Sequence, residues 1–317
     1  MNLKEFRQRQ KELAKLLVER VDRGALRTFL IFSYLGARIC YAETHPLLLF
    51  DEEKFRDFER FKSFLLHLKK AGHFSVFAHT PLFVNLEDLS LYQKLALAQN
   101  FYKVFWDEEK KLALFNLRHL AETLPDQEFL YLINQEPDLT EIEVILTKNY
   151  QITYRGKLSE LDSSYLTEKD SIFAEPEVIL LRSFKEYPFK WVAVVTHHFS
   201  RIFSHQYVRH TWLNFNQRSH RYTKVDKFVI PKAFKENDVK KYYEVIQKGL
   251  EIYRDITKNI KRESARFVVP QGVATTLLAT GPELVWQDFI EKRAIPQAQE
   301  EIRDLAVFLK ELLEMGL

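Results

Sequence analysis

The chain alternates between stretches in which apolar residues recur at helical spacing and shorter apolar runs that are typical of strands. Apolar positions that return every three to four residues predict helices over residues 3–21, 52–71, 89–106, 238–261 and 297–315. Gly72 stands where the second of these helices would end, because glycine commonly follows a helix C-terminus. Residues 112–125 predict a short strand that runs into another helix.

A section rich in strand signals occupies the middle of the chain. Apolar and β-branched runs predict strands over residues 128–133, 142–147, 150–157, 178–184 and 191–199. Lys148 and Asn149 separate two of these runs and predict a hairpin turn. Strands and helices are mixed along the sequence, so the predicted fold class is α/β or α+β.

Composition narrows the class of protein. The 317 residues are 46% hydrophobic and 29% charged, which is typical of a globular chain of one large or two ordinary domains. A net charge of only +3 argues against a general DNA-binding protein. The single cysteine, Cys40, excludes an internal disulfide and fits a cytoplasmic location. The charged N-terminus lacks the apolar core of a signal peptide, and no uncharged run predicts a membrane span.

The stretch RHTWLNFNQRSHRY, residues 209–222, is the strongest candidate for chemistry. Arg209, Arg218 and Arg221 occur among histidine, asparagine and glutamine side chains, with no lysine. Arginine is preferred where planar, bidentate contact with phosphate or carboxylate is needed. This cluster therefore predicts a site for an anionic ligand.

Other common sites find little support in the sequence. None of the 8 glycines falls in a phosphate-loop spacing. The histidines that could bind a metal lack a ligand spacing, so no metal site is expected; they are His197, His198, His205 and His210. Within the strand predicted for residues 191–199, one of the adjacent histidines should face solvent and the other the core. Ser219 lacks a nucleophile elbow and is interpreted as an anion-contacting hydroxyl, and Cys40 as a small core residue.

The arginine-rich stretch resembles the signature of the flavin-dependent thymidylate synthases, R-H-R-x-x-S-x-N-E-x-S-x-R-Y. The matching residues are Arg209, His210, Asn216, Ser219, Arg221 and Tyr222, with Gln206 just upstream. Thr211, Asn214 and Gln217 depart from the signature. Residues 265–306 are similar to the family's C-terminal block, and GHFSVFAH (72–79) and GARICYA (36–42) resemble two N-terminal blocks.

The resemblance covers roughly residues 30–80 and 191–310 and implies a fold and an activity. The expected fold is a single domain over 1–317, with a central mixed sheet flanked by helices and an extra α+β insertion at 80–190. The implied activity is reductive methylation of dUMP to dTMP, with FAD as cofactor and NADPH and methylenetetrahydrofolate as co-substrates. Family members form homotetramers with shared active sites, and the same assembly is expected here.

The resemblance also implies roles for individual residues. The nucleotide would be bound by Gln206, Arg209, Gln217, Arg218, Ser219, Arg221, Arg266 and Arg293. The flavin would contact His73, Ser75, Arg209, His210, Thr211 and Gln217. Catalysis would rest on Arg293, whose positive charge favours an ionised uracil ring, and on Ser219.

Several of these residues also have a structural interpretation. Arg293 could bind helix carbonyls, and Arg266 could pair with Glu263 on the surface. His73 and His79 could be core histidines. These alternatives stay open on sequence grounds.

The flavin side departs most from the family. Pro282-Glu283-Leu284 stands where the family has N-x-R, and Thr211 replaces an arginine. Asn116 and Arg118, within the 80–190 segment, reproduce the missing spacing and could replace these contacts. Two other functions therefore remain: a paralogue that binds a nucleotide without catalysis, or the same flavin chemistry on another pyrimidine or on uracil in RNA.

Overall fold

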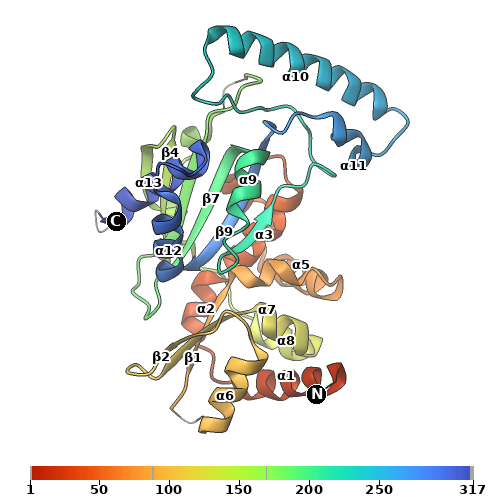
Figure 1. Cartoon of the computed structure of the whole chain (residues 1–317). Helices are drawn as coiled ribbons and strands as arrows, with labels where there is room; N and C mark the ends of the chain where they lie inside the picture. The colour runs from red at the N-terminus through yellow and green to blue at the C-terminus, as the bar shows by residue number, and fades with distance from the viewer. Residues whose placement is uncertain (1, 88, 169, 315–317) are drawn as a thin grey trace.

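The computed structural model describes residues 2–87, 89–168 and 170–314, and its strands form two sheets (Figure 1). The smaller sheet has the order β1-β3-β2 and contains Pro81–Asn85 (β1), Phe105–Asp107 (β2) and Leu112–Asn116 (β3). The six-stranded sheet has the order β5-β4-β6-β7-β9-β8. Its strands are Ile142–Lys148 (β4), Gln151–Lys157 (β5), Glu177–Ser183 (β6), Trp191–Ser200 (β7), Asn214–Gln217 (β8) and Ala274–Pro282 (β9).

Every neighbouring pair of described strands in the large sheet is antiparallel, so the prediction of a mixed sheet was wrong. Short connections such as the turn between β4 and β5 can join antiparallel neighbours, whereas parallel neighbours need a long crossover. The predicted hairpin at Lys148 and Asn149 is confirmed, with Asn149 and Tyr150 in the left-handed region at φ 48° and 64°.

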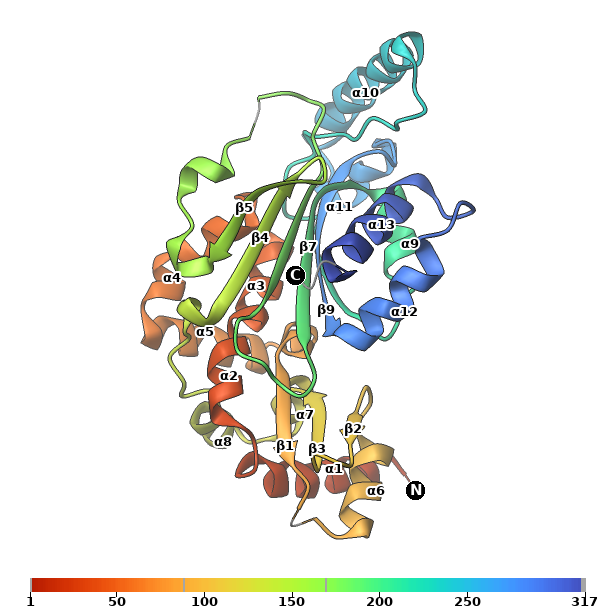
Figure 2. The same cartoon turned by 90° about the vertical axis from the view of Figure 1, so that its left-hand side faces the viewer.

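The large sheet is the middle of three layers (Figure 2). Helices Ile31–Tyr41 (α3) and Phe58–Lys70 (α5) lie on one side of it, and Arg201–Tyr207 (α9), Glu283–Arg293 (α12) and Glu300–Glu314 (α13) lie on the other. Residues of β6 alternate between the two cores, with Ile179 and Leu181 in one and Val178 and Leu180 in the other. Because both faces are buried, the central strands are continuous apolar runs.

The remaining helices extend the molecule at its two ends (Figure 1). The small sheet is accompanied by Leu3–Val18 (α1), Leu91–Asn100 (α6), Arg118–Thr123 (α7) and Asp126–Leu132 (α8). Arg23–Phe29 (α2) and Glu53–Arg56 (α4) connect to the central layers, while Glu236–Ile256 (α10) and Arg262–Ala265 (α11) lie at the opposite end. Residues 80–190 are thus divided between both sheets. Across the described residues, no helix joins the length and the apolar character that a membrane crossing requires.

Three local predictions were wrong for identifiable reasons. Residues 128–133 belong to helix α8 and not to a strand, because Asp126 and Glu128 stabilise its first turn. The helix predicted over 52–71 is broken at Asp57, whose side chain caps α5 by accepting from the backbone N–H of Arg60 at 3.0 Å. The helix predicted over 89–106 ends at Asn100, and Lys103 adopts φ 56° before β2 begins.

Candidate functional site

The short helix α9 carries Gln206 and leads into the arginine-rich loop. Its N-cap, Ser200, donates its backbone N–H to the Glu301 carboxylate at 2.9 Å, and its hydroxyl donates to the same group. Burial raises the pKa of Glu301, which the bonds from Ser200 partly offset. Glu301, from the C-terminal block, therefore fixes the start of the helix that presents half-buried Gln206 and exposed Arg209.

Two predicted site residues meet at the end of α12. Arg293 donates its Nε–H to Nε2 of His210 at 2.8 Å, and the Phe289 ring packs edge-on against His210 with centroids 4.8 Å apart. Desolvation and the charge of Arg293 lower the pKa of His210 to about 4, so the imidazole is neutral with its proton on Nδ1. The structure thus joins the residue expected at the uracil ring to one expected at the flavin.

A second group consists of guanidinium groups around His220. Desolvation, together with the charges of Arg201, Arg218 and Arg266, lowers the pKa of His220 to about 4. Burial and then the charge of Arg266 lower the pKa of Arg201. The Nε atom of Arg218 is buried without a hydrogen-bond partner among the described residues. An anion bound here would relieve both the mutual repulsion and the missing hydrogen bond.

Arg201 is a site candidate that the sequence reasoning missed. It is the first residue of α9, where the positive end of the helix dipole disfavours a cation. The sequence signal that could have indicated Arg201 was an arginine at a helix start, a few residues before the predicted anion site.

The loop after β8 places Ser219 and Arg221 beside α11. The backbone N–H of Ser219 donates to the Cys40 carbonyl at 3.0 Å, which ties the loop to α3. Arg221 is exposed, lies over the Tyr222 ring at 5.3 Å, and pairs with the Glu263 carboxylate at 3.4 Å. The predicted pairing of Arg266 with Glu263 is found only as a bond from Nε to the Glu263 carbonyl, at 3.1 Å.

The residues expected at the flavin are more dispersed. His73 and Ser75 are exposed at the start of the 3-10 helix Phe74–His79, and Thr211 is exposed in the arginine-rich loop. In the described part of the chain, no side-chain hydrogen bond or ion pair joins them or Arg209 to the other predicted residues. Gln217 donates to Thr275 Oγ1 at 3.2 Å within the sheet.

His79 is a core histidine, as one interpretation of the sequence proposed. Its ring is fully buried, with Nδ1 at 2.9 Å from Thr280 Oγ1 and Nε2 at 2.7 Å from Asn216 Oδ1. Desolvation lowers its pKa to about 4. Cys40, expected in the core, is only half-buried; its sulfur accepts a bond from Asn216 at 3.1 Å, and desolvation raises the pKa of its thiol.

Residues 80–190 contact the arginine-rich loop directly through Lys103, which the sequence reasoning also missed. Its ammonium group donates to the Leu213 carbonyl and to Asn214 Oδ1, both at 2.8 Å. Desolvation and then the charge of Arg118 lower its pKa to about 8. Lys103 therefore binds the loop two and three residues after Thr211, the position at which the family signature has an arginine.

The proposed replacements Asn116 and Arg118 lie in the same region. Asn116 is buried on β3, and its Oδ1 has no hydrogen-bond partner among the described residues. Arg118 pairs with Glu122 at 2.5 Å and lies over the Tyr102 ring at 5.6 Å.

His197 and His198 correct another expectation, because both side chains are buried, at 0% and 7% exposure. The strand alternation that would send one ring to solvent is interrupted by a register shift between His197 and Phe199. Desolvation lowers the pKa of both imidazoles.

Together these features define an α+β protein with clustered guanidinium groups suited to a phosphorylated ligand. Residues 180–315 match the family model described as "Thymidylate synthase complementing protein". This range contains most of the predicted site residues, whereas His73, Ser75 and Lys103 lie outside it. This match confirms the resemblance found in the motifs.

Relatives named "Flavin-dependent thymidylate synthase" show the extent of the similarity. The protein from Thermococcus onnurineus is 35% identical over 116 residues, covering 34% of this chain and 47% of the relative. Those from Pyrococcus furiosus and Sulfolobus acidocaldarius are 33% and 35% identical, each over 34% of this chain and over 48% and 43% of their own lengths. The chain spans about half the length of the curated relatives it matches.

Proposed function

We propose that this protein binds FAD and dUMP and converts dUMP to dTMP by reductive methylation. Methylenetetrahydrofolate would donate the carbon and NADPH the reducing equivalents. The proposal is carried by the contact of Arg293 with His210 at 2.8 Å, which unites two residues of separate motifs. The names of the relatives support the same reaction.

The guanidinium group around His220 suits the nucleotide's phosphate. The charges of Arg201, Arg218 and Arg266 all lower the pKa of His220, and the buried Nε of Arg218 has no hydrogen-bond partner among the described residues. A doubly charged phosphate needs several cationic donors in a partly dry site. Arg221 and Ser219 on the adjoining loop, with Gln206, Arg209 and Gln217, would complete the nucleotide site.

Arg293 would act on the uracil ring. A guanidinium beside the ring favours the ionised imide and polarises the ring for hydride attack. His210 can hold the guanidinium in one orientation, because its neutral Nε2 accepts the Arg293 Nε–H. No protein nucleophile is then required, and Ser219 serves the nucleotide.

The residues at the flavin end fit an anionic cofactor when Lys103 is included. FAD, when bound, supplies the hydride. Lys103 would offset the loss of an arginine at Thr211, and the unpartnered Oδ1 of Asn116 marks unused hydrogen-bonding capacity in the same segment. His73, Ser75, His210, Thr211 and Gln217 would contribute the remaining contacts.

A nucleotide-binding protein without catalysis is the second candidate, favoured by the start of α12. The family's N-x-R is replaced by Pro282-Glu283-Leu284, and Glu283 pairs with Lys190 at 3.5 Å while Leu284 is 65% exposed. An acidic side chain there opposes the binding of FAD phosphates. The third possibility is the same flavin chemistry on another pyrimidine or on uracil in RNA.

The deciding experiment combines binding and turnover on the full chain. Purified protein is titrated with FAD and, separately, with dUMP, and dTMP formation is then measured with NADPH and methylenetetrahydrofolate. Saturable binding of both ligands with dTMP formation is expected. Binding of dUMP without any flavin binding would establish the second candidate in its place.

The expected homotetramer remains part of this proposal. Support comes from large apolar side chains exposed on and beside α10, including Val245 at 56% and Phe267 at 88%. Light scattering on the purified protein tests it, because a monomer at micromolar concentration would contradict shared sites.

A further inference from the structure

A histidine and carboxylate cluster lies at the end of β7, next to the arginine-rich loop, because Thr276 contacts both the His197 ring and the backbone N–H of Arg218. His198 has φ 63° within the strand, where a non-glycine residue is strained, and the register shifts between His197 and Phe199. The strand thereby brings both imidazoles to the same side, stacked with centroids 3.8 Å apart. Strained backbone of this kind is concentrated at functional sites.

A third group converges on the two rings from the segment before β6. The Glu168 carboxylate lies with one oxygen 3.2 Å from Nε2 of His197 and the other 3.7 Å from Nε2 of His198. One ligand atom from each of the three residues lies within 4.8 Å of the others. Ligands at about 2.0–2.2 Å around a tetrahedral ion are separated by about 3.3 Å, so small side-chain movements would suffice.

The surroundings orient His197 as a ligand. Its Nδ1 lies 2.7 Å from Thr276 Oγ1, which can accept the Nδ1 proton, so the Nε2 proton now donated to the Glu168 carboxylate at 3.2 Å can be released when a metal binds. Metal-binding histidines almost always donate their second ring N–H to an acceptor, and the Thr276 hydroxyl can take that place here.

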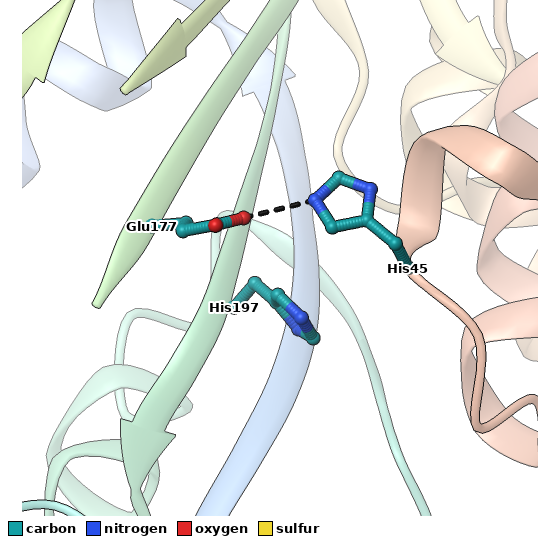
Figure 3. Close-up of side chains that lie close together, drawn as sticks. All are labelled: His45, Glu177 and His197. Carbon is teal, nitrogen blue, oxygen red and sulfur yellow. Dashed lines mark hydrogen bonds and ion pairs between the residues drawn. The ribbon is translucent and has the colours of Figure 1, made fainter. Parts of the chain in front are cut away.

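His45 and Glu177 lie beside His197 (Figure 3), but their hydrogen bonds do not suit metal binding. Nδ1 of His45 accepts the Leu47 backbone N–H at 3.2 Å, so its proton is on Nε2, which donates to Glu177 at 2.9 Å. Because the Leu47 N–H occupies Nδ1, the proton of His45 cannot move to that nitrogen to free Nε2 for a metal. The Glu177 carboxylate is also paired with the ammonium group of Lys148 at 3.6 Å. His45 and Glu177 are therefore not assigned as metal ligands.

The cluster borders a large cavity. Glu168 and His198 line a cavity of about 790 Å³, whose other walls include Tyr242 and Glu301. Three protein ligands with an open position toward a cavity are typical of metal sites that bind a further small ligand. Two imidazoles and one carboxylate suit Zn²⁺, Co²⁺ or Fe²⁺ better than Mg²⁺ or Ca²⁺.

We propose that His197, His198 and Glu168 form a binding site for a divalent transition-metal ion whose open coordination position faces this cavity. The site does not depend on the proposed nucleotide reaction, and its test uses neither flavin nor nucleotide.

The test titrates the full-length, chelator-treated protein with Zn²⁺ by calorimetry and with Co²⁺ by visible absorption. One ion per chain is expected, with a d–d band typical of four-coordinate Co²⁺ and no competition from Mg²⁺. Absence of saturable binding would overturn the proposal and leave a plain histidine–carboxylate contact.

Variants identify the ligands. Glu168→Ala and His198→Ala should each weaken the binding of Zn²⁺ by more than about 100-fold. Even mutations of residues that only orient a metal ligand typically cost about 10–100-fold in affinity. Glu168 lies in a loop and is exposed, so its replacement should leave the thermal unfolding of the metal-free protein unchanged. His45→Gln is the matched control and should retain binding. Loss of binding in this control, with binding retained in His198→Ala, would overturn the assigned ligands.

Discussion

The two ends of the arginine-rich loop are built in different ways. At the proposed phosphate end, Arg266 matches the family's C-terminal block and Arg218 stands at a variable position of the signature, and the charges of both lower the pKa of His220. At the flavin end, Thr211 has lost the family's arginine, and Lys103 approaches from a segment outside the matched range. One cation of such a site can thus come from a motif residue and another from a distant segment of the chain.

The largest effect is expected at the point where the two ends meet. Arg293→Ala should lower kcat for dTMP formation by at least about 100-fold, because it removes the charge that stabilises the ionised ring. Steady-state kinetics measures the loss, and circular dichroism checks the fold. Lys292→Ala, which removes an exposed neighbour paired with Asp288, is the control and should leave kcat unchanged. Equal activity in both variants would remove Arg293 from the mechanism.

A smaller loss is expected at the phosphate end. Arg221→Ala should weaken the binding of dUMP by roughly 30-fold, or about 2 kcal/mol, because a charge-assisted bond to phosphate is lost. The affinity for deoxyuridine should be nearly unchanged. Calorimetry with both ligands measures the difference. Arg254→Ala on α10 is a control for a general change in positive charge. If Arg221→Ala weakens both ligands equally, Arg221 does not contact the phosphate.

The flavin end should respond to Lys103. Lys103→Ala should weaken the binding of FAD by roughly 10-fold and leave the affinity for dUMP unchanged, because one partly buried cation is removed. Flavin fluorescence measures the affinity. Lys111→Ala, an exposed lysine paired with Glu87 in the same segment, is the control. Weaker dUMP with unchanged FAD would place Lys103 at the wrong end of the loop.

Helices and strands with one clear period were predictable from sequence. The hairpin of β4 and β5 and the amphipathic helix α10 were found close to their observed bounds because one periodic signal dominates each. Helix α3 and strand β9 were missed. Both are buried nearly throughout, so neither has a polar face to reveal its period.

The site was predictable only where motifs carried it. Arg293 and His210, both singled out by the motifs, lie in contact, whereas Lys103 reaches the loop through a tertiary contact that no local pattern encodes. The placement of His197 and His198 depends on a bulge, and a one-residue irregularity in a strand moves side chains to the other face.

Acid stability offers a finer comparison, between His220 at the proposed phosphate end and the core histidine His79. Both have a folded-state pKa of about 4, below the ordinary 6.5, so the unfolded chain binds their protons first as pH falls. Each should therefore destabilise the fold between pH 6.5 and 4, with a slope of about 1.4 kcal/mol per pH unit, and neither should contribute above pH 6.5.

The causes of the two shifts differ, and that difference can be measured. Desolvation dominates both, but only His220 is also lowered by three arginines. A bound phosphate would offset those charges, so dUMP should raise the pKa of His220 and leave that of His79 unchanged. Histidine NMR titration with and without dUMP measures this, with His220→Gln and His79→Gln used to assign the signals. An equal rise at both residues would indicate a general change in burial, and the phosphate would then lie elsewhere.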